Sequence, residues 1–342
     1  MSGVFFQQLG LPDPDVNLSV GSDTGARQTA RIMMEMEPVL TARAPDLVLV
    51  YGDVNSTVAA AMVCAKLQIR VAHVEAGLRS FDRTMPEEIN RLITDQLADL
   101  LFTPSLDGDA NLAHEGISAA KVHFVGNVMI DTLVRMLPAA AHITLDVPPR
   151  YALVTLHRPA NVDDGPWLAE MLTALADISR DLPILFPVRP RTRKQIQQSG
   201  LASALGSQLL LLDPLPYLEF LALQLHAAAV VTDSGGIQEE TTFLGIPCLT
   251  VRENTERPVT VTHGTNFLAG RDIAQVRSNL LRILSGTPKP SSIPPLWDGK
   301  AAERIAGVLL DETDSLTLPM AALPNPGLDV RREAIRANHA GD

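Results

Sequence analysis

One stretch of the sequence, residues 227–260, carries the residue types that bind a phosphate group. A short run of small apolar residues favours a strand buried on both faces, and Ser234, Gly235 and Gly236 interrupt it before helical spacing resumes. A helix N-terminus offers unpaired N–H groups to an anion. Two arginines further along, one of them Arg257, can clamp a diphosphate. The pattern predicts a phosphate site, and a plain strand–turn–helix connection is the alternative.

Three carboxylates and one histidine form a second group of candidate residues. Asp53 ends an apolar run, where the alternative is an N-cap for the following helix. Glu75 ends another, and a carboxylate there is hard to satisfy by structure alone. Glu87 and Arg91 are four residues apart on one predicted helix, so a surface ion pair is the alternative. His157 follows a third apolar run, and a structural hydrogen bond would explain it equally well.

Helices and strands alternate along the whole chain, which is typical of a parallel, doubly wound α/β sheet. The predicted strands lie at residues 46–51, 70–74, 100–102 and 122–125, and then at 151–156, 183–187, 208–212, 228–232 and 247–251. Ligands of open parallel sheets bind beyond the carboxyl ends of the strands. The residues at these ends are Asp53, Glu75, His157, Arg189 and Ser234. Two sheets facing each other across a cleft would bring the two groups of residues together.

A proline-rich segment near residue 146 divides the chain into two predicted domains. We expect one Rossmann-like domain at residues 1–146, carrying the carboxylates, and a second one at residues 147–312. Residues 313–342 lose their periodicity and carry prolines and scattered charge. This composition predicts a mostly disordered tail.

Composition and charge narrow the classes of function. A net charge of −11 over 342 residues argues against binding to nucleic acid or to a membrane surface. No apolar run reaches the length of a bilayer span, and the first residues do not form a secretory signal. Cys64 and Cys248 fit reduced thiols of a cytoplasmic protein. Without metal-ligand spacings or a G-x-G-x-x-G turn after a strand, we expect neither a metal nor a nicotinamide cofactor.

Several motifs occur in an order and spacing that resembles the non-hydrolysing UDP-N-acetylglucosamine 2-epimerases. They are DVNST, HVEAGLRS, MPEEINR, LVTLHRPAN, DSGGIQEE and TERP, and the resemblance covers nearly the entire chain. Members of this family interconvert UDP-N-acetylglucosamine and UDP-N-acetylmannosamine by eliminating UDP and adding it back. The resemblance implies two Rossmann-like domains facing a cleft (the GT-B type), no cofactor and a homodimer. It also implies a role in bacterial cell-surface polysaccharide synthesis.

Residue by residue, the resemblance implies a site for a UDP-sugar. The matches to the family's catalytic residues are Asp53, Glu75, Glu87 and His157. The matches to its substrate-binding residues are Arg91, Phe220, Ser234, Gly235, Gly236, Glu240 and Arg257. In this interpretation Phe220 lies against uracil and Glu240 holds the ribose hydroxyls. Our hypothesis gives Asp53 a part in proton transfer at C2, while Glu75 and Glu87 position the sugar and the second proton.

The chain differs from the family pattern at its start and at one strand end. It lacks a first βαβ portion with a G-T-R-P-E loop, so we expect an incomplete N-terminal domain. Arg189 stands where relatives often carry histidine. Two alternatives to this epimerase remain open. One is a hydrolysing epimerase or a GT-B glycosyltransferase, and the other is a truncated, inactive binder of a nucleotide sugar.

Overall fold

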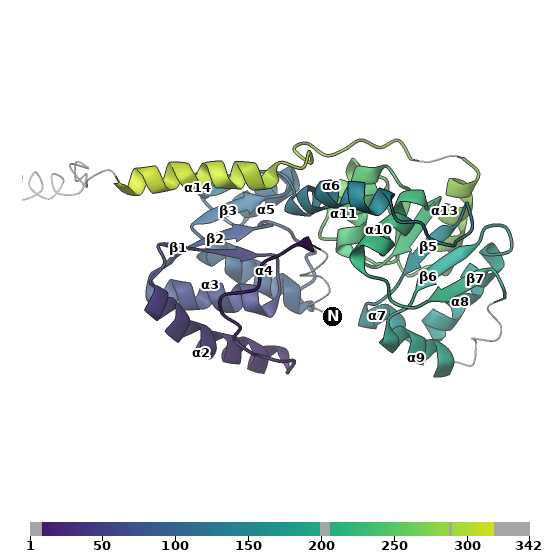
Figure 1. Cartoon of the computed structure of the whole chain (residues 1–342), viewed down its shortest axis with the longest axis horizontal. Coiled ribbons are helices and arrows are strands. Elements are labelled where there is room, and N and C mark those ends of the chain that lie inside the picture. Colours follow the sequence, from purple (N-terminus) through teal and green to yellow (C-terminus); the bar gives the residue numbers. More distant parts are fainter. Residues whose placement is uncertain (1–8, 199–205, 287–288, 318–342) are drawn as a thin grey trace, which may run out of the picture. The chain divides into compact units, whose positions relative to one another are not determined.

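The computed structural model describes residues 9–198, 206–286 and 289–317 as alternating helices and strands (Figure 1). The chain divides into two compact units, residues 1–302 and 303–342. Both sheets lie in the first unit. In the described part of the chain, each helix is too short or too polar to cross a membrane.

The first sheet is built from four parallel strands. These are β1 (Leu47–Tyr51), β2 (Arg70–Val74), β3 (Leu100–Thr103) and β4 (Val122–Phe124), paired in the order β1-β2-β3-β4. Each new strand adds to the same side of the previous one, so the order never reverses among the described residues. The parallel α/β sheet predicted for this domain is confirmed. The predicted loss of a first βαβ portion stays a prediction.

Helices pack around this first sheet. They are α2 (Gly25–Arg43), α3 (Asn55–Leu67), α4 (Pro86–Leu97), α5 (Leu106–His114), the short 3-10 helix η1 (Ala119–Lys121) and α6 (Val128–Ala141). The small residues Ala60, Ala61 and Cys64 of α3 lie in a core with Val71 and Leu101 of the strands. Because these helix residues are small, α3 lies close against the sheet, which fixes the ends of β1 and β2.

The second sheet has six parallel strands and is doubly wound. They are β5 (Ala152–Thr155), β6 (Ile184–Pro187), β7 (Leu209–Leu212), β8 (Ala229–Thr232), β9 (Cys248–Thr250) and β10 (Asn266–Leu268), in the order β10-β9-β8-β5-β6-β7. The order reverses between β5 and β8, and such a reversal is where open α/β sheets bind ligands. β10 was not predicted from the sequence, because it begins with the polar Asn266 and contains no β-branched residue.

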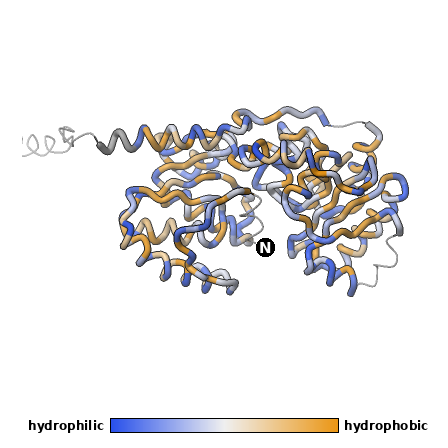
Figure 2. The backbone as a smooth tube through the Cα atoms, viewed as in Figure 1, coloured by the Kyte–Doolittle hydropathy of each residue, from blue (hydrophilic) through white to orange (hydrophobic). Residues whose placement is uncertain are grey.

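Helices cover both faces of the second sheet. They are α7 (Pro159–Val162), α8 (Gly165–Ile178), α9 (Pro190–Gln198), α10 (Tyr217–His226), α11 (Gly235–Leu244), α12 (Pro258–Thr262) and α13 (Ile273–Leu284). On one face, Leu172 of α8 and Leu280 of α13 share a core with Val154. On the other, Leu223 of α10 packs with Leu153. Figure 2 colours the backbone by hydropathy, and hydrophobic residues lie along the strands.

Helix α14 (Ala301–Thr317) corrects the predicted start of the tail. We expected residues from 313 onward to leave the helix, but α14 continues to Thr317. The first proline after Ala301 is Pro319, so no helix-breaking residue lies within this span. The rest of the predicted tail, residues 318–342, lies outside the described residues. The boundary predicted near residue 146 falls between α6 and β5 and stays a prediction.

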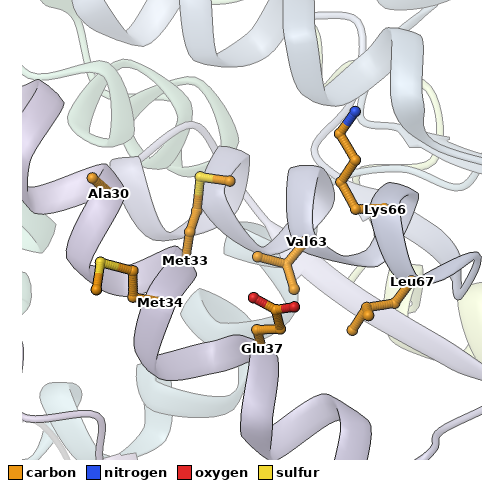
Figure 3. Close-up of a pocket in the computed structure, with 7 residues that line it drawn as sticks. All are labelled: Ala30, Met33, Met34, Glu37, Val63, Lys66 and Leu67. Atoms are coloured by element: carbon orange, nitrogen blue, oxygen red, sulfur yellow. The ribbon is translucent and has the colours of Figure 1, made fainter.

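A groove of about 380 Å³ lies on α2 and α3 (Figure 3). Met33, Met34 and Leu67 give it an apolar lining, and Glu37 and Lys66 add one charge of each sign. It contains no pair of acidic groups and no residue singled out by the sequence. The residues suited to chemistry lie at the strand ends instead.

Candidate active site

Asp53 and Glu75 follow the two neighbouring strands β1 and β2. Tyr51 and Val74, the last residues of these strands, are partners in the sheet register, so the chain leaves both strands at the same edge. The N-cap alternative for Asp53 is wrong, since α3 begins after Val54 without a side-chain cap. The Asp53 carboxylate instead accepts a hydrogen bond from the Arg91 guanidinium.

Glu75 combines a raised pKa with an unusual backbone. Burial raises the pKa of its carboxyl group and the charge of Asp53 raises it further, whereas Arg257 opposes the shift. Its φ angle is 73°, in the left-handed region that side chains other than glycine rarely adopt. Such a conformation costs about 1–3 kcal/mol and persists where the surrounding structure imposes it, often at functional sites. Glu75 is therefore held in place against a local preference.

Arg257 binds three carboxylates from three segments of the chain. Its guanidinium nitrogens lie 2.7 Å from Glu75, 2.8 Å from Glu239 and 2.6 Å from Glu256. Burial lowers the pKa of Arg257, but the three carboxylates outweigh this effect and raise it. Burial also raises the pKa of Glu239 to about 7, against the opposing charge of Arg257. This cluster joins Glu75, at the end of the first sheet, to the loop after β9 in the second.

The N-terminus of α11 adjoins the same arginine. The helix begins at Gly235, directly after Ser234, as the sequence predicts. A Cβ atom at Gly235 would lie 2.5 Å from the Arg257 Nη1 atom, so only glycine leaves room for the guanidinium here. The partial positive charge of a helix N-terminus and a full guanidinium charge thus lie side by side. This combination suits a diphosphate.

Helix α4 places its two adjacent glutamates in different surroundings. Glu88 is 2% exposed, and its carboxylate accepts hydrogen bonds from Arg91 and from the backbone N–H groups of Ser80 and Phe81. Glu87 is exposed, and its negative charge acts on Arg158, which follows β5 in the second sheet. Glu87 therefore faces the second sheet, while Glu88 fixes Arg91 and the preceding loop.

His157 and Asp233 form a pair at the switch point of the second sheet. The Asp233 carboxylate is completely buried and lies 2.8 Å from His157 Nδ1. It also accepts the backbone N–H groups of His157 and Arg158 at 3.0 and 2.9 Å. Burial raises the pKa of Asp233, but these hydrogen bonds outweigh it and lower the pKa. Asp233 thus fixes the ring of His157 through Nδ1 and leaves Nε2 for another partner.

A cavity of about 180 Å³ lies beside this pair. Its lining comprises Thr155, His157, Pro187, Arg189, Pro214, Leu215, Tyr217, Phe220, Ser234 and Ile237. Behind it, the buried Glu240 accepts hydrogen bonds from Tyr217 Oη at 2.9 Å and Gln224 Nε2 at 3.2 Å. Burial raises the pKa of Glu240 to about 6, against these two hydrogen bonds. An aromatic ring, a histidine and a serine around a small hollow suit a nucleotide base and its phosphates.

The structure brings most of the predicted residues into contact with one another. They occupy three adjoining parts of the site: Asp53 with Arg91, Glu75 with Arg257, and His157 with Phe220 and Ser234. Four acidic residues of the site were not predicted from the sequence, namely Glu88, Asp233, Glu239 and Glu256. All four lie within the motifs MPEEINR, DSGGIQEE and TERP, which was the available signal. The functional roles of the predicted residues stay predictions.

No group of three or more histidine, cysteine or acidic side chains among the described residues is placed to hold a metal ion. The charged groups of the site form ion pairs with one another instead. Each of Arg91, Arg252 and Arg257 contacts at least one carboxylate. The chemistry open to this arrangement is proton transfer next to a bound phosphate.

Comparison with known proteins gives a consistent result. A family model described as UDP-N-acetylglucosamine 2-epimerase matches residues 1–310. The UDP-N-acetylglucosamine 2-epimerase of Methanococcus maripaludis is 40% identical over 91% of this chain and 88% of its own length. The UDP-2,3-diacetamido-2,3-dideoxy-D-glucuronate 2-epimerase of Pseudomonas aeruginosa is 43% identical over 79% of this chain and 76% of its own. The crystal structure of the Methanocaldococcus jannaschii UDP-GlcNAc 2-epimerase, in complex with UDP-GlcNAc and UDP, superposes with a TM-score of 0.83 at 40% identity, covering 91% of this chain and 88% of that one.

Proposed function

Because the chain belongs to the UDP-N-acetylglucosamine 2-epimerase family, we propose that it interconverts UDP-N-acetylglucosamine and UDP-N-acetylmannosamine without hydrolysing the sugar nucleotide. The position of Arg257 carries this proposal. Its guanidinium contacts Glu75 and lies against the first residue of α11. One cation thus joins a carboxylate suited to proton transfer with the predicted diphosphate site.

The proposed reaction inverts C2 in two half-reactions. A base removes the C2 proton, the electron pair of that C–H bond forms a C1–C2 double bond, and the C1–O bond breaks as UDP leaves. A UDP oxygen then adds back to C1, and an acid returns a proton to C2 from the opposite face. The departing diphosphate gains negative charge, which Arg257 and the N-terminus of α11 are placed to stabilise.

Three carboxylates supply the proton chemistry in this proposal. Asp53, whose side chain is 31% exposed, takes part in proton transfer at C2. Glu75 is suited to hold a proton, because burial raises its pKa. Glu75 and Glu87 position the sugar and the second proton. His157 is held by Asp233 in the cavity lining, where it interacts with the pyrophosphate in this proposal.

Exchange of the C2 hydrogen with solvent deuterium tests this proposal. We expect the wild-type protein to incorporate deuterium at C2 of UDP-N-acetylglucosamine, followed by proton NMR. We expect Asp53→Asn to slow the exchange about 10²–10⁴-fold, the usual contribution of a general acid or base. Asp181→Asn, at an exposed position, is the matched control. Normal exchange in Asp53→Asn would contradict the role of Asp53.

The reaction products distinguish the proposed epimerase from the alternative functions. Release of free N-acetylmannosamine would identify a hydrolysing enzyme. Binding of UDP without any turnover would identify an inactive nucleotide-sugar binder.

A second candidate substrate is UDP-2,3-diacetamido-2,3-dideoxy-D-glucuronate. The 43% identity to the P. aeruginosa relative favours it. It differs from UDP-N-acetylglucosamine by a carboxylate at C6 and an acetamido group at C3, while the reacting carbon is the same. Measuring kcat/KM for both substrates decides between them. A 100-fold ratio of the two kcat/KM values corresponds to about 2.7 kcal/mol of discrimination.

A UDP-sugar is the small-molecule partner in either case. The homodimer, the cytoplasmic location and the role in surface polysaccharide synthesis remain predictions. Light scattering of the purified protein at several concentrations tests the homodimer.

A further inference from the structure

His73 of β2 is completely buried, and both of its ring nitrogens face oxygen atoms. Nδ1 lies 2.6 Å from Asp95 Oδ1 on α4, and Nε2 lies 2.8 Å from the carbonyl oxygen of Gly52. A carbonyl oxygen can only accept a hydrogen bond, so Nε2 must carry a proton. Nδ1 faces a carboxylate that also binds Arg79, and an ionised carboxylate only accepts. This geometry satisfies both contacts only if the ring carries two protons.

The charges around His73 balance only when its ring is positive. Asp95, completely buried, also binds Arg79 at 2.7 Å, and Arg79 binds Glu115 of the segment after α5 at 2.7 Å. Two carboxylates then face two cations. With a neutral ring, the buried Asp95 would have to share Arg79 with the partly exposed Glu115, and the charge of Asp95 would be only partly balanced. Glu75, two residues further along, also acts on the ring, and it too is acidic.

The electrostatics of the ring agree with this count. Burial lowers the pKa of His73, but the hydrogen bond and charge of Asp95, the Gly52 carbonyl and the charge of Glu75 outweigh it, so the pKa is raised. In return, the positive ring lowers the pKa of Glu75.

Gly52 is the point through which His73 can act on the candidate site. Its N–H group donates to the Val74 carbonyl at 3.1 Å, and its own carbonyl accepts from His73. Its φ angle is 63°, and a Cβ atom here would lie 3.5 Å from Glu75 Oε2. The turn between β1 and Asp53 is thus held from both sides.

We propose that His73 is a permanently protonated positioning residue, which fixes the turn that carries Asp53 and places a buried positive charge next to Glu75. The roles of Asp53 and Glu75 rest on the proposed function, whereas the charge of the ring does not. His73 does not touch the substrate in this proposal. It acts through Gly52 and through its field at Glu75.

Nitrogen-15 NMR of the histidine rings tests the charge directly. The protein has eight histidines, and labelling them with ¹⁵N allows His73 to be assigned by the signal lost in His73→Gln. We expect both ring nitrogens of His73 to keep imidazolium shifts up to pH 9, where an unperturbed histidine is neutral. A neutral tautomer at pH 8 would overturn the proposal. This measurement uses the wild-type protein, so it does not depend on how well a variant folds.

The variant Asp95→Asn tests the effect on catalysis, because it keeps a polar partner for Nδ1 and removes the charge that holds the second proton. We expect kcat to fall at least tenfold, with KM and the affinity for UDP changed less than twofold. We expect the alkaline limb of the kcat profile, where the protonated Glu75 loses its proton, to move to higher pH by about one unit, since Glu75 loses a neighbouring positive charge. A purely structural role would leave that limb in place, and this result would contradict the proposal.

The matched control is His142→Gln, an exposed position at the end of α6, which should change neither kcat nor the profile. Failure of the proposed function has a different signature. If wild-type protein turns over no UDP-sugar while the His73 ring stays charged, the epimerase assignment fails and the charge assignment stands.

Discussion

The two sheets each hold a histidine beside a buried aspartate near the strand ends, and the two pairs differ in exposure. His73 and Asp95 are both completely buried, and both ring nitrogens of His73 are engaged. His157 is 25% exposed, only its Nδ1 contacts Asp233, and its ring lines the cavity of the second sheet. The same two residue types therefore build a fixed charge in one sheet and leave a free nitrogen in the other.

This difference shows that burial of the second nitrogen decides what a histidine–aspartate pair can do. An imidazole with both nitrogens bonded to protein has no atom left for a ligand. An imidazole fixed at one nitrogen presents the other in a defined direction, which is the arrangement that proton transfer and phosphate binding need. Residue type alone does not separate the two cases.

The largest expected effect concerns His157, the histidine that lines the cavity. We expect His157→Asn to lower kcat about 10²–10⁴-fold, because it removes the imidazole ring that lines the cavity. The measurement is the initial rate of epimer formation at saturating substrate. His226→Asn, exposed at the end of α10, is the control and should keep the wild-type rate. If His157→Asn stayed fully active, the two histidines would not differ in the way described.

A second prediction concerns Asp95, the partner of the buried His73. We expect Asp95→Ala to lower the free energy of unfolding by about 3–5 kcal/mol, because it leaves the charges of His73 and Arg79 buried without their shared partner. Urea denaturation followed by circular dichroism measures this loss. Asp181→Ala, at an exposed position, should change stability by less than about 0.5 kcal/mol. A similarly small loss for Asp95→Ala would show that this pair is not a structural element.

The smallest expected effect concerns a buried acid without a cationic partner. The folded-state pKa of Glu240, about 6, exceeds its ordinary value of 4.5, so the folded protein binds more protons between these pH values. The free energy of unfolding should therefore fall as pH rises from 4.5 to 6, by about 2 kcal/mol in total. Glu240→Gln should lack this contribution, and Glu170→Gln, exposed on α8, should keep it.

Urea titrations at pH 4.5, 5.5 and 6.5 measure the difference between these two variants. If the free energies of unfolding of the two variants changed in parallel with pH, the burial of Glu240 would be fully offset by its hydrogen bonds, as the charges of the His73–Asp95 pair offset each other. The contrast between paired and unpaired buried charge would then be wrong for this part of the protein.

Local patterns predicted the elements better than the contacts between them. β2 has the bounds expected from sequence, and every strand end singled out by the sequence lies at the edge of a sheet. The contact between Glu75 and Arg257 joins residues 182 positions apart, and no periodicity carries that information. The pairing of Arg91 with Glu88 rather than Glu87 depends on which helix face packs inward, which two adjacent glutamates do not reveal.

The left-handed backbone of Glu75 has a consequence for how this protein responds to mutation. Replacing Glu75 by glycine would relieve an unfavourable conformation and remove a buried acid at once. The same change would leave Arg257 with two carboxylate partners, Glu239 and Glu256, instead of three. The backbone conformation at this position therefore favours glycine, whereas the ion pair with Arg257 and the proposed proton chemistry favour glutamate.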